Sequence, residues 1–183
     1  MSGVRKGLTR VEIALRWDPS AAGEPPHDLD LVAAVYASAD PHGEPVHLVH
    51  FGSRSPDGTI TLSRDSRTGQ GFGFDEVMVI ELDRMASGAG RVVVGVVIQD
   101  AGAGGPAPRR KPFAAVPGTG LRVRAGYEDL ATTDFAEVAD ATAATVAEFT
   151  REDSGGWTLE EARPRGFEAD AHEFTRVMGA ARA

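Results

Sequence analysis

The run RVVVGVVIQD, residues 91 to 100, decides the fold class of this chain. Six of its ten residues are valine or isoleucine, whose branched side chains favour the extended backbone of a strand. Arg91 to Gln99 is therefore the strongest strand that the sequence predicts. The neighbouring segments carry shorter versions of the same signal, so we expect an all-β fold with a minor helical part.

Shorter strands are predicted before and after this run. Val11, Ile13, Leu15 and Trp17 alternate with polar or small residues, which is typical of a half-buried strand that ends at 18–19. The stretch 29–36 has few polar breaks, which favours a central strand. Further strands are expected at 46–51, 59–62, 77–82, 121–125 and, as a final strand, in GGWTLEEA (155–162), followed by a closing helix in EADAHEFTRVMGAAR (168–182).

Two segments need a separate interpretation. The turn sequence SPDG at 55–58 favours a hairpin between the strands expected on either side of it. The stretch ADATAATVAEFT (139–150) is ambiguous, because its alanines favour a helix while Thr145, Val146 and Phe149 favour a strand.

Length and composition predict one domain, residues 1–183, built as a β-sandwich of about eight to ten strands with a C-terminal helix. The net charge of −8, from 27 acidic and 19 basic residues, argues against a nucleic-acid partner and favours cations. The absence of cysteine excludes disulfides, thiolate metal sites and a cysteine nucleophile. No signal peptide or membrane span is apparent, so we expect a cytoplasmic protein.

Two acidic segments are candidates for a metal site. DSRTGQGFGFDE (65–76) has the length of an EF-hand loop but lacks that loop's oxygen side chains and its glycine at the sixth position. It keeps a glycine-rich centre bracketed by Asp65 on one side and by Asp75 and Glu76 on the other. In HDLDL (27–31), Asp28 and Asp30 are two residues apart and face the same side of a strand.

Neither segment alone supplies the six to eight oxygens that calcium prefers, but the two together could. The alternative is that the aspartate pair lies in a solvated loop end and binds nothing. Chemistry of other kinds has little support, since the five histidines lack zinc-peptidase spacing and no nucleophile motif is present. We therefore expect no enzymatic activity. Phe72 and Phe74 are expected to pack as loop anchors, or else to contact a partner.

The motifs WDPS, DLDL, SPDGTI, the acidic loop running into DEVMVIEL, and VVVGVVIQDA follow one another in an order that resembles the TerD family of tellurium-resistance and stress-response proteins. The resemblance extends from about residue 7 to residue 179. It implies a calcium-binding β-sandwich, and it implies a strand rather than a helix at 142–150. It also implies calcium ligands at Asp28, Asp30, Asp65, Asp75 and Glu76.

The chain departs from the family pattern inside the acidic loop. Ser66 stands where the family has asparagine, and Phe72 and Phe74 replace two aspartates. Fewer carboxylates reduce calcium affinity, so we expect one calcium site rather than two. The resemblance implies a non-enzymatic module that acts through other proteins of the stress system. The alternatives are a metal-free scaffold, in which the two phenylalanines fill the space of the ion, and, less favoured, calcium-dependent docking at a membrane surface.

Overall fold

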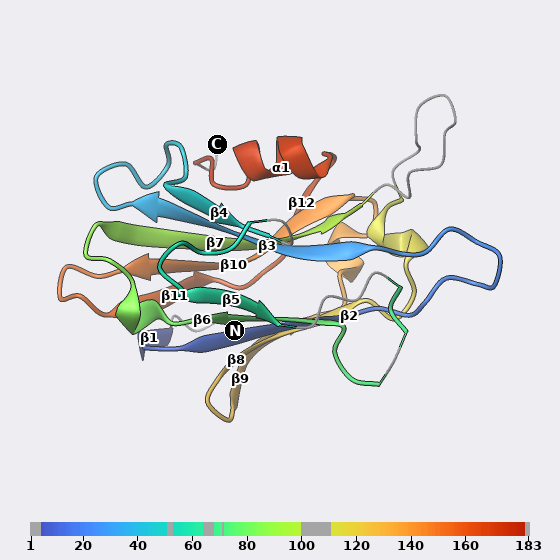
Figure 1. The fold of residues 1–183 in the computed structure, drawn as a ribbon, viewed down its shortest axis with the longest axis horizontal. Helices are drawn as coiled ribbons and strands as arrows, with labels where there is room; N and C mark the ends of the chain where they lie inside the picture. Colours follow the sequence, from blue (N-terminus) through green and yellow to red (C-terminus); the bar gives the residue numbers. More distant parts are fainter. Residues whose placement is uncertain (1–4, 51–52, 64–67, 71, 100–110, 182–183) are drawn as a thin grey trace.

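The structure is a computed structural model that describes residues 5–50, 53–63, 68–70, 72–99 and 111–181. In these ranges two antiparallel sheets pack face to face as a sandwich (Figure 1). The larger sheet has the order β1 (Arg5–Leu8), β11 (Trp157–Glu161), β10 (Ala143–Arg151), β7 (Ala89–Ile98), β3 (Leu29–Ala37) and β4 (His47–Val49), and β12 (Arg165–Phe167) also pairs with β10.

The smaller sheet has five strands. Their order is β5 (Ile60–Ser63), β6 (Glu76–Ile80), β2 (Val11–Arg16), β8 (Gly120–Ala125) and β9 (Glu128–Thr133). One α-helix, α1 (Ala171–Val177), covers the outer face of the seven-stranded sheet, as Figure 1 shows. The described single-turn 3-10 helices are η1 (Leu82–Arg84), η2 (Phe113–Ala115) and η3 (Ala136–Val138).

Strand β7 is buried on both faces, which explains its unbroken apolar sequence. Val92, Val94 and Val96 point into the core between the sheets, whereas Val93 and Val97 pack on the other face beneath α1. Alternating side chains of a strand face opposite sides, so a strand covered on both sides needs apolar residues throughout. The predicted strand at 91–99 is thereby confirmed, together with the sandwich class.

The ambiguous segment is strand β10, which pairs with β7 on one side and with β11 and β12 on the other. Its alanines are fully buried: Ala143 and Ala144 are both 0% exposed. Tertiary packing therefore overrides the helix propensity of this stretch. The closing helix is also confirmed, and Phe174 and Met178 are buried beneath it while Val177 is 36% exposed.

The predicted hairpin at 55–58 is wrong, although the turn itself forms. Gly58 N–H donates to the Ser55 carbonyl at 3.2 Å, and Gly58 has φ +71°, a left-handed conformation that favours glycine. However, β4 pairs with β3 and β5 pairs with β6, so the chain crosses here from one sheet to the other. A turn sequence specifies the local bend but does not specify which strands pair.

Three of the described strands are not predicted by the sequence, namely β1, β9 and β12. The first two are polar strands with mostly exposed or half-buried residues, and β12 has only three residues. None of the three shows the apolar alternation that marks a half-buried strand. Because β12 follows β11, the segment GGWTLEEA is a strand but not the final one.

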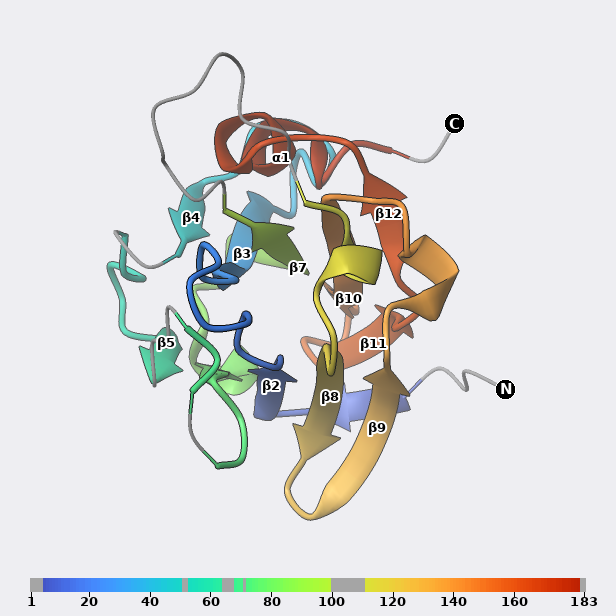
Figure 2. The ribbon, with the colours of Figure 1, turned by 90° about the vertical axis from the view of Figure 1, so that its right-hand side faces the viewer.

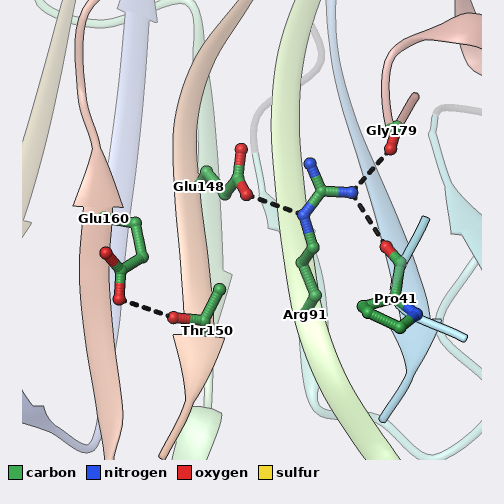
Figure 3. A network of polar contacts seen from close by, with 6 residues as sticks. All are labelled: Pro41, Arg91, Glu148, Thr150, Glu160 and Gly179. Atoms are coloured by element: carbon green, nitrogen blue, oxygen red, sulfur yellow. Dashed lines mark hydrogen bonds and ion pairs between the residues drawn. The ribbon is translucent and has the colours of Figure 1, made fainter. Parts of the chain in front are cut away.

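A buried arginine fastens the C-terminal segment to the large sheet. Arg91, at the start of β7, is only 4% exposed. Its guanidinium pairs with Glu148 of β10 at 2.7 Å and donates to the carbonyls of Pro41 at 2.9 Å and Gly179 at 2.6 Å (Figure 3). It also lies 5.2 Å from the ring centroid of Tyr36. Such full hydrogen bonding is what permits a buried charge.

We expect Gly95→Ala to destabilise the protein by about 1–3 kcal/mol, because it overpacks the contact between β7 and α1. A Cβ at Gly95 would lie 2.5 Å from Phe174 Cζ and 3.0 Å from the Ala144 carbonyl oxygen. The control is Gly88→Ala, whose Cβ meets no atom within 4 Å. Urea unfolding measures both, and equal stabilities would contradict this account of how α1 packs.

We expect Asp57→Asn to reduce the loss of stability in acid. Burial raises the pKa of Asp57, but hydrogen bonds from Ser55 and Thr59 outweigh it and lower the pKa to about 2. A depressed carboxyl pKa stabilises the fold above the ordinary value of about 3.8, and this contribution disappears as the pH falls from about 4 to 2.

The measurement is urea unfolding at several pH values, with Asp83→Asn, a substitution of an exposed aspartate, as the matched control. The Asp57 variant should lose less stability than the wild type between pH 4 and pH 2. If the free energy of unfolding falls equally between pH 4 and pH 2 in the wild type and in both variants, Asp57 does not have this role.

Candidate functional site

Four of the five predicted ligands are described, and all four lie at one end of the sandwich. Here β2 ends, β3 and β6 begin and β7 ends, as two backbone hydrogen bonds show. Asp75 N–H donates to the Leu15 carbonyl at 2.8 Å, and Gln99 N–H donates to the Asp28 carbonyl at 2.8 Å. Figure 2 presents this end to the viewer. The fifth predicted ligand, Asp65, lies outside the described residues.

Glu76 links the two sheets through the core. It is 0% exposed, and its Oε2 accepts a hydrogen bond of 2.7 Å from the backbone N–H of Leu31 in β3. Strand β4 pairs with β3 only from Ala33 to Val35, so it does not reach Leu31. The carboxylate therefore provides an acceptor for the Leu31 N–H. Without it, this N–H would be buried and unpaired, which costs about 1–3 kcal/mol.

Asp75 extends the edge of the neighbouring strand. It is 8% exposed, and its Oδ2 accepts a hydrogen bond of 2.9 Å from the backbone N–H of Trp17, directly after β2. The side chain thus continues the pairing of β2 with β6 by one further hydrogen bond. Asp75 and Glu76 are adjacent in sequence, but they serve different strands.

Asp30 lies on the opposite face of β3 from the core. Leu29 and Leu31 belong to the core between the sheets, whereas Val32, which shares a face with Asp30, belongs to the cluster beneath α1. Asp30 is 7% exposed, and its Oδ2 accepts a hydrogen bond of 2.7 Å from Gln99 Nε2. Asp30 and Glu76 thus approach β3 from its two different faces.

Trp17 connects several segments at this end of the sandwich, although the sequence predicts for it only a position at the end of a strand. Its indole Nε1 donates to the His27 carbonyl at 2.9 Å, while its backbone serves Asp75. Gly69 packs directly on the indole, since a Cβ there would lie 2.6 Å from Trp17 Cδ1, and Gly69 has φ +66°. The buried tryptophan therefore connects the acidic loop to the segment before β3.

His27 is close to a lysine. Lys111 Nζ lies 3.4 Å from His27 Nδ1 and donates to the Pro25 carbonyl at 3.3 Å. Burial and the Lys111 ammonium both lower the pKa of His27, which favours the neutral imidazole. The His27 side chain thus contacts Lys111, while its backbone carbonyl holds the indole of Trp17.

The two loop phenylalanines do not share an environment. Phe72 is 103% exposed, so the expectation that it packs as an anchor is wrong. Phe74 instead lies beneath a guanidinium, with Arg122 Cζ 4.5 Å from its ring centroid. Two residues that alternate in sequence share a face only in a strand, and this loop is not one.

Within the described ranges, no three acidic or histidine side chains lie close enough together to hold a metal ion by themselves. The donor chemistry nevertheless suits a hard cation, because carboxylates and loop carbonyls are the ligands that calcium prefers. In the same ranges, no helix has the length and apolar character needed to cross a membrane.

Comparisons with known proteins agree on one family. The sequence profile of the TerD domain matches residues 1–175. The tellurium resistance protein TerD of Serratia marcescens is 32% identical over 124 residues, which is 67% of this chain and 62% of that protein. The match thus spans less than two thirds of this curated relative.

Two solved structures resemble the whole chain. The crystal structure of a homologue of the telluride resistance protein TerD from Streptomyces coelicolor A3(2) is 52% identical, with a TM-score of 0.89, and covers 96% of this chain and 100% of that one. The crystal structure of SAV2460, a protein of unknown function, is 50% identical with a TM-score of 0.90. It covers 97% of this chain and 100% of that one.

We expect Glu76→Ala to lower the free energy of unfolding by about 1–3 kcal/mol in calcium-free buffer, because the Leu31 N–H loses its acceptor. The control is Glu81→Ala, which removes a glutamate whose side chain is 28% exposed and pairs with Arg10 at 3.0 Å. That surface pair is expected to contribute less than about 1 kcal/mol. Chemical denaturation tests both variants, and a Glu76 variant that loses stability only in the presence of calcium would refute the structural role.

Proposed function

The chain belongs to the TerD family, and on that premise we propose that it is a calcium-binding, non-enzymatic module of a cytoplasmic tellurium-resistance and stress-response system. The observation that carries the proposal is the meeting of two distant acidic segments. Glu76 and the backbone of Leu31, 45 positions apart in sequence, are hydrogen bonded at the end of the sandwich where Asp28, Asp30 and Asp75 also lie.

Calcium would be held by carboxylates from both segments. We assign Asp28, Asp30 and Asp75 to the site, with Asp65 and carbonyls of the glycine-rich loop as further ligands. Glu76 keeps Oε2 on the Leu31 N–H, so it would act as a ligand through its other oxygen. The bound cation would supply charge neutralisation for this cluster, and no chemical step is assigned to it.

One ion is expected rather than two, because this loop has fewer carboxylates than the family pattern. Phe72 does not support the metal-free alternative, in which the phenylalanines fill the ion's space, since its side chain is exposed. We propose that the loops, once ordered by calcium, present a surface to another protein of the same system.

The first test is the thermal midpoint of metal-stripped protein, titrated with calcium and, separately, with magnesium. A ligand at about 100 times its dissociation constant adds roughly 2.7 kcal/mol, which raises the midpoint by several degrees in a domain of this size. We expect calcium to give this shift and magnesium to give little.

The variant with both Asp30→Asn and Asp65→Asn should abolish the calcium shift. The matched control is Asp153→Asn, which removes an exposed aspartate after β10, at the opposite end of the sandwich. If calcium stabilises the double variant as much as it stabilises the wild type, these aspartates are not ligands. If calcium has no effect on the wild type, the calcium proposal fails.

A second candidate function, calcium-dependent docking on a membrane, is favoured by one observation. Phe72 projects fully into solvent from the acidic loop, where it could enter a lipid surface while calcium bridges to anionic headgroups. Co-sedimentation with vesicles that contain phosphatidylserine tests it. Binding that needs both calcium and Phe72 would favour docking, and sedimentation unchanged by a chelator and by Phe72→Ala would remove it.

A further inference from the structure

A groove of about 1020 Å³ runs along the side of the sandwich, and at Arg16 and Phe74 it reaches the end that carries the predicted calcium ligands. Its walls come from β8 and β9 of the small sheet and from the segment that joins β11 to β12. Its volume is at the upper end of the range typical of sites for small molecules. Leu130, Leu159 and Ala162 provide its apolar part.

One end of the groove carries two arginines on neighbouring strands. Arg16, the last residue of β2, is paired in register with Gly120 of β8, and Arg122 is the next outward-facing residue of β8. Because Gly120 has no side chain, the Arg16 side chain can lie across it. A Cβ at Gly120 would already lie 3.2 Å from Arg16 Nε.

Arg122 is held in place but only loosely neutralised. Its guanidinium stacks on Phe74, and its Nε is buried without a hydrogen-bond acceptor in the part of the chain that the structure describes. Its ion-pair distances are long, at 3.7 Å to Glu12 and 3.8 Å to Asp129. The same Asp129 oxygen accepts a hydrogen bond of 2.7 Å from Arg124.

Arg16 forms no ion pair with any residue in the described ranges. Asp18, two residues after Arg16, lies over Gly118 and does not line the groove. Two cations on adjacent strands repel each other, so an anion between them would stabilise this arrangement.

The acidic residues at the other end of the groove are already engaged. Asp134 accepts from Ala136 N–H at 3.0 Å, and Glu160 accepts from the Thr150 hydroxyl at 2.8 Å, as Figure 3 shows. Glu137 accepts from Arg163 at 2.7 Å. Ala136 N–H and the Thr150 hydroxyl are neutral donors, so the groove has a positive end at Arg16 and Arg122 and an acidic end where Glu137 is paired with Arg163.

We propose that this groove binds a small molecule that carries an oxyanion group, a phosphate or a carboxylate, on an apolar body. The oxyanion lies against the guanidiniums of Arg16 and Arg122, and each planar guanidinium can donate two parallel hydrogen bonds. Thr132, the register partner of Arg122 on β9, adds a hydroxyl. The apolar body lies along Leu130 and Leu159. No calcium is needed for this interaction.

The test is isothermal titration of the calcium-free protein with phenyl phosphate and, separately, with benzoate at constant ionic strength. The two probes distinguish a phosphate site from a carboxylate site. We expect saturable binding of at least one probe, weakened about tenfold or more by Arg16→Gln or by Arg122→Gln, since each loses a charge-assisted hydrogen bond. Arg16 is exposed, so its variant keeps the fold.

Arg10→Gln is the matched control, because it removes the same charge from an exposed arginine that is paired with Glu81 at 3.0 Å and does not line the groove. Its affinity should stay within about twofold of the wild type, since surface charges away from a site are largely screened. Arg122→Lys keeps the charge but loses the planar fork, and it should bind more weakly than the wild type.

The proposal is overturned if neither probe binds saturably at millimolar concentration. It is also overturned if the Arg16 and Arg122 variants bind as the wild type does, or if the Arg10 control loses as much affinity as they do. Because calcium is absent throughout, a failure here is independent of a failure of the calcium proposal.

Discussion

The hydrogen bond from the Leu31 N–H to the buried carboxylate of Glu76 determines how the two sheets meet at the end that carries the predicted calcium ligands. The rest of the interface between the sheets is apolar, and apolar packing tolerates small shifts of one layer over the other. A buried polar contact is directional and costly to leave unmade, so it fixes β6 against β3 at one position. Asp75 precedes Glu76 and Asp30 precedes Leu31, so this contact brings the two acidic segments together.

The strands with strong apolar patterns could be predicted from sequence, and their pairing could not. β7 was identified by its valines, because burial on both faces requires apolar residues at every position. The assignment of β4 and β5 to different sheets depends on contacts between residues far apart in the chain, and no local turn signal encodes them. The polar edge strand β9 is held mainly by its pairing with β8, so its own sequence carries little signal.

The candidate site was predictable to a similar extent. The acidic residue types identified both segments, and folding does bring the described ones to one end of the sandwich. The orientation of their side chains was not predictable, because Asp30 and Glu76 contact β3 from opposite faces. Asp65 lies outside the described residues. Trp17 was missed because a tryptophan that ends a strand resembles any core residue, and only its three contacts in the fold reveal its role.

The central position of β7 has a consequence for motion. Its backbone is paired on both sides and its side chains are buried on both faces, so its amide hydrogens can exchange with solvent only when the whole domain opens. The acidic loop is attached at its end to β6, in the other sheet, and not to β7. Local opening around Asp75 and Glu76 therefore does not require the central strand to open.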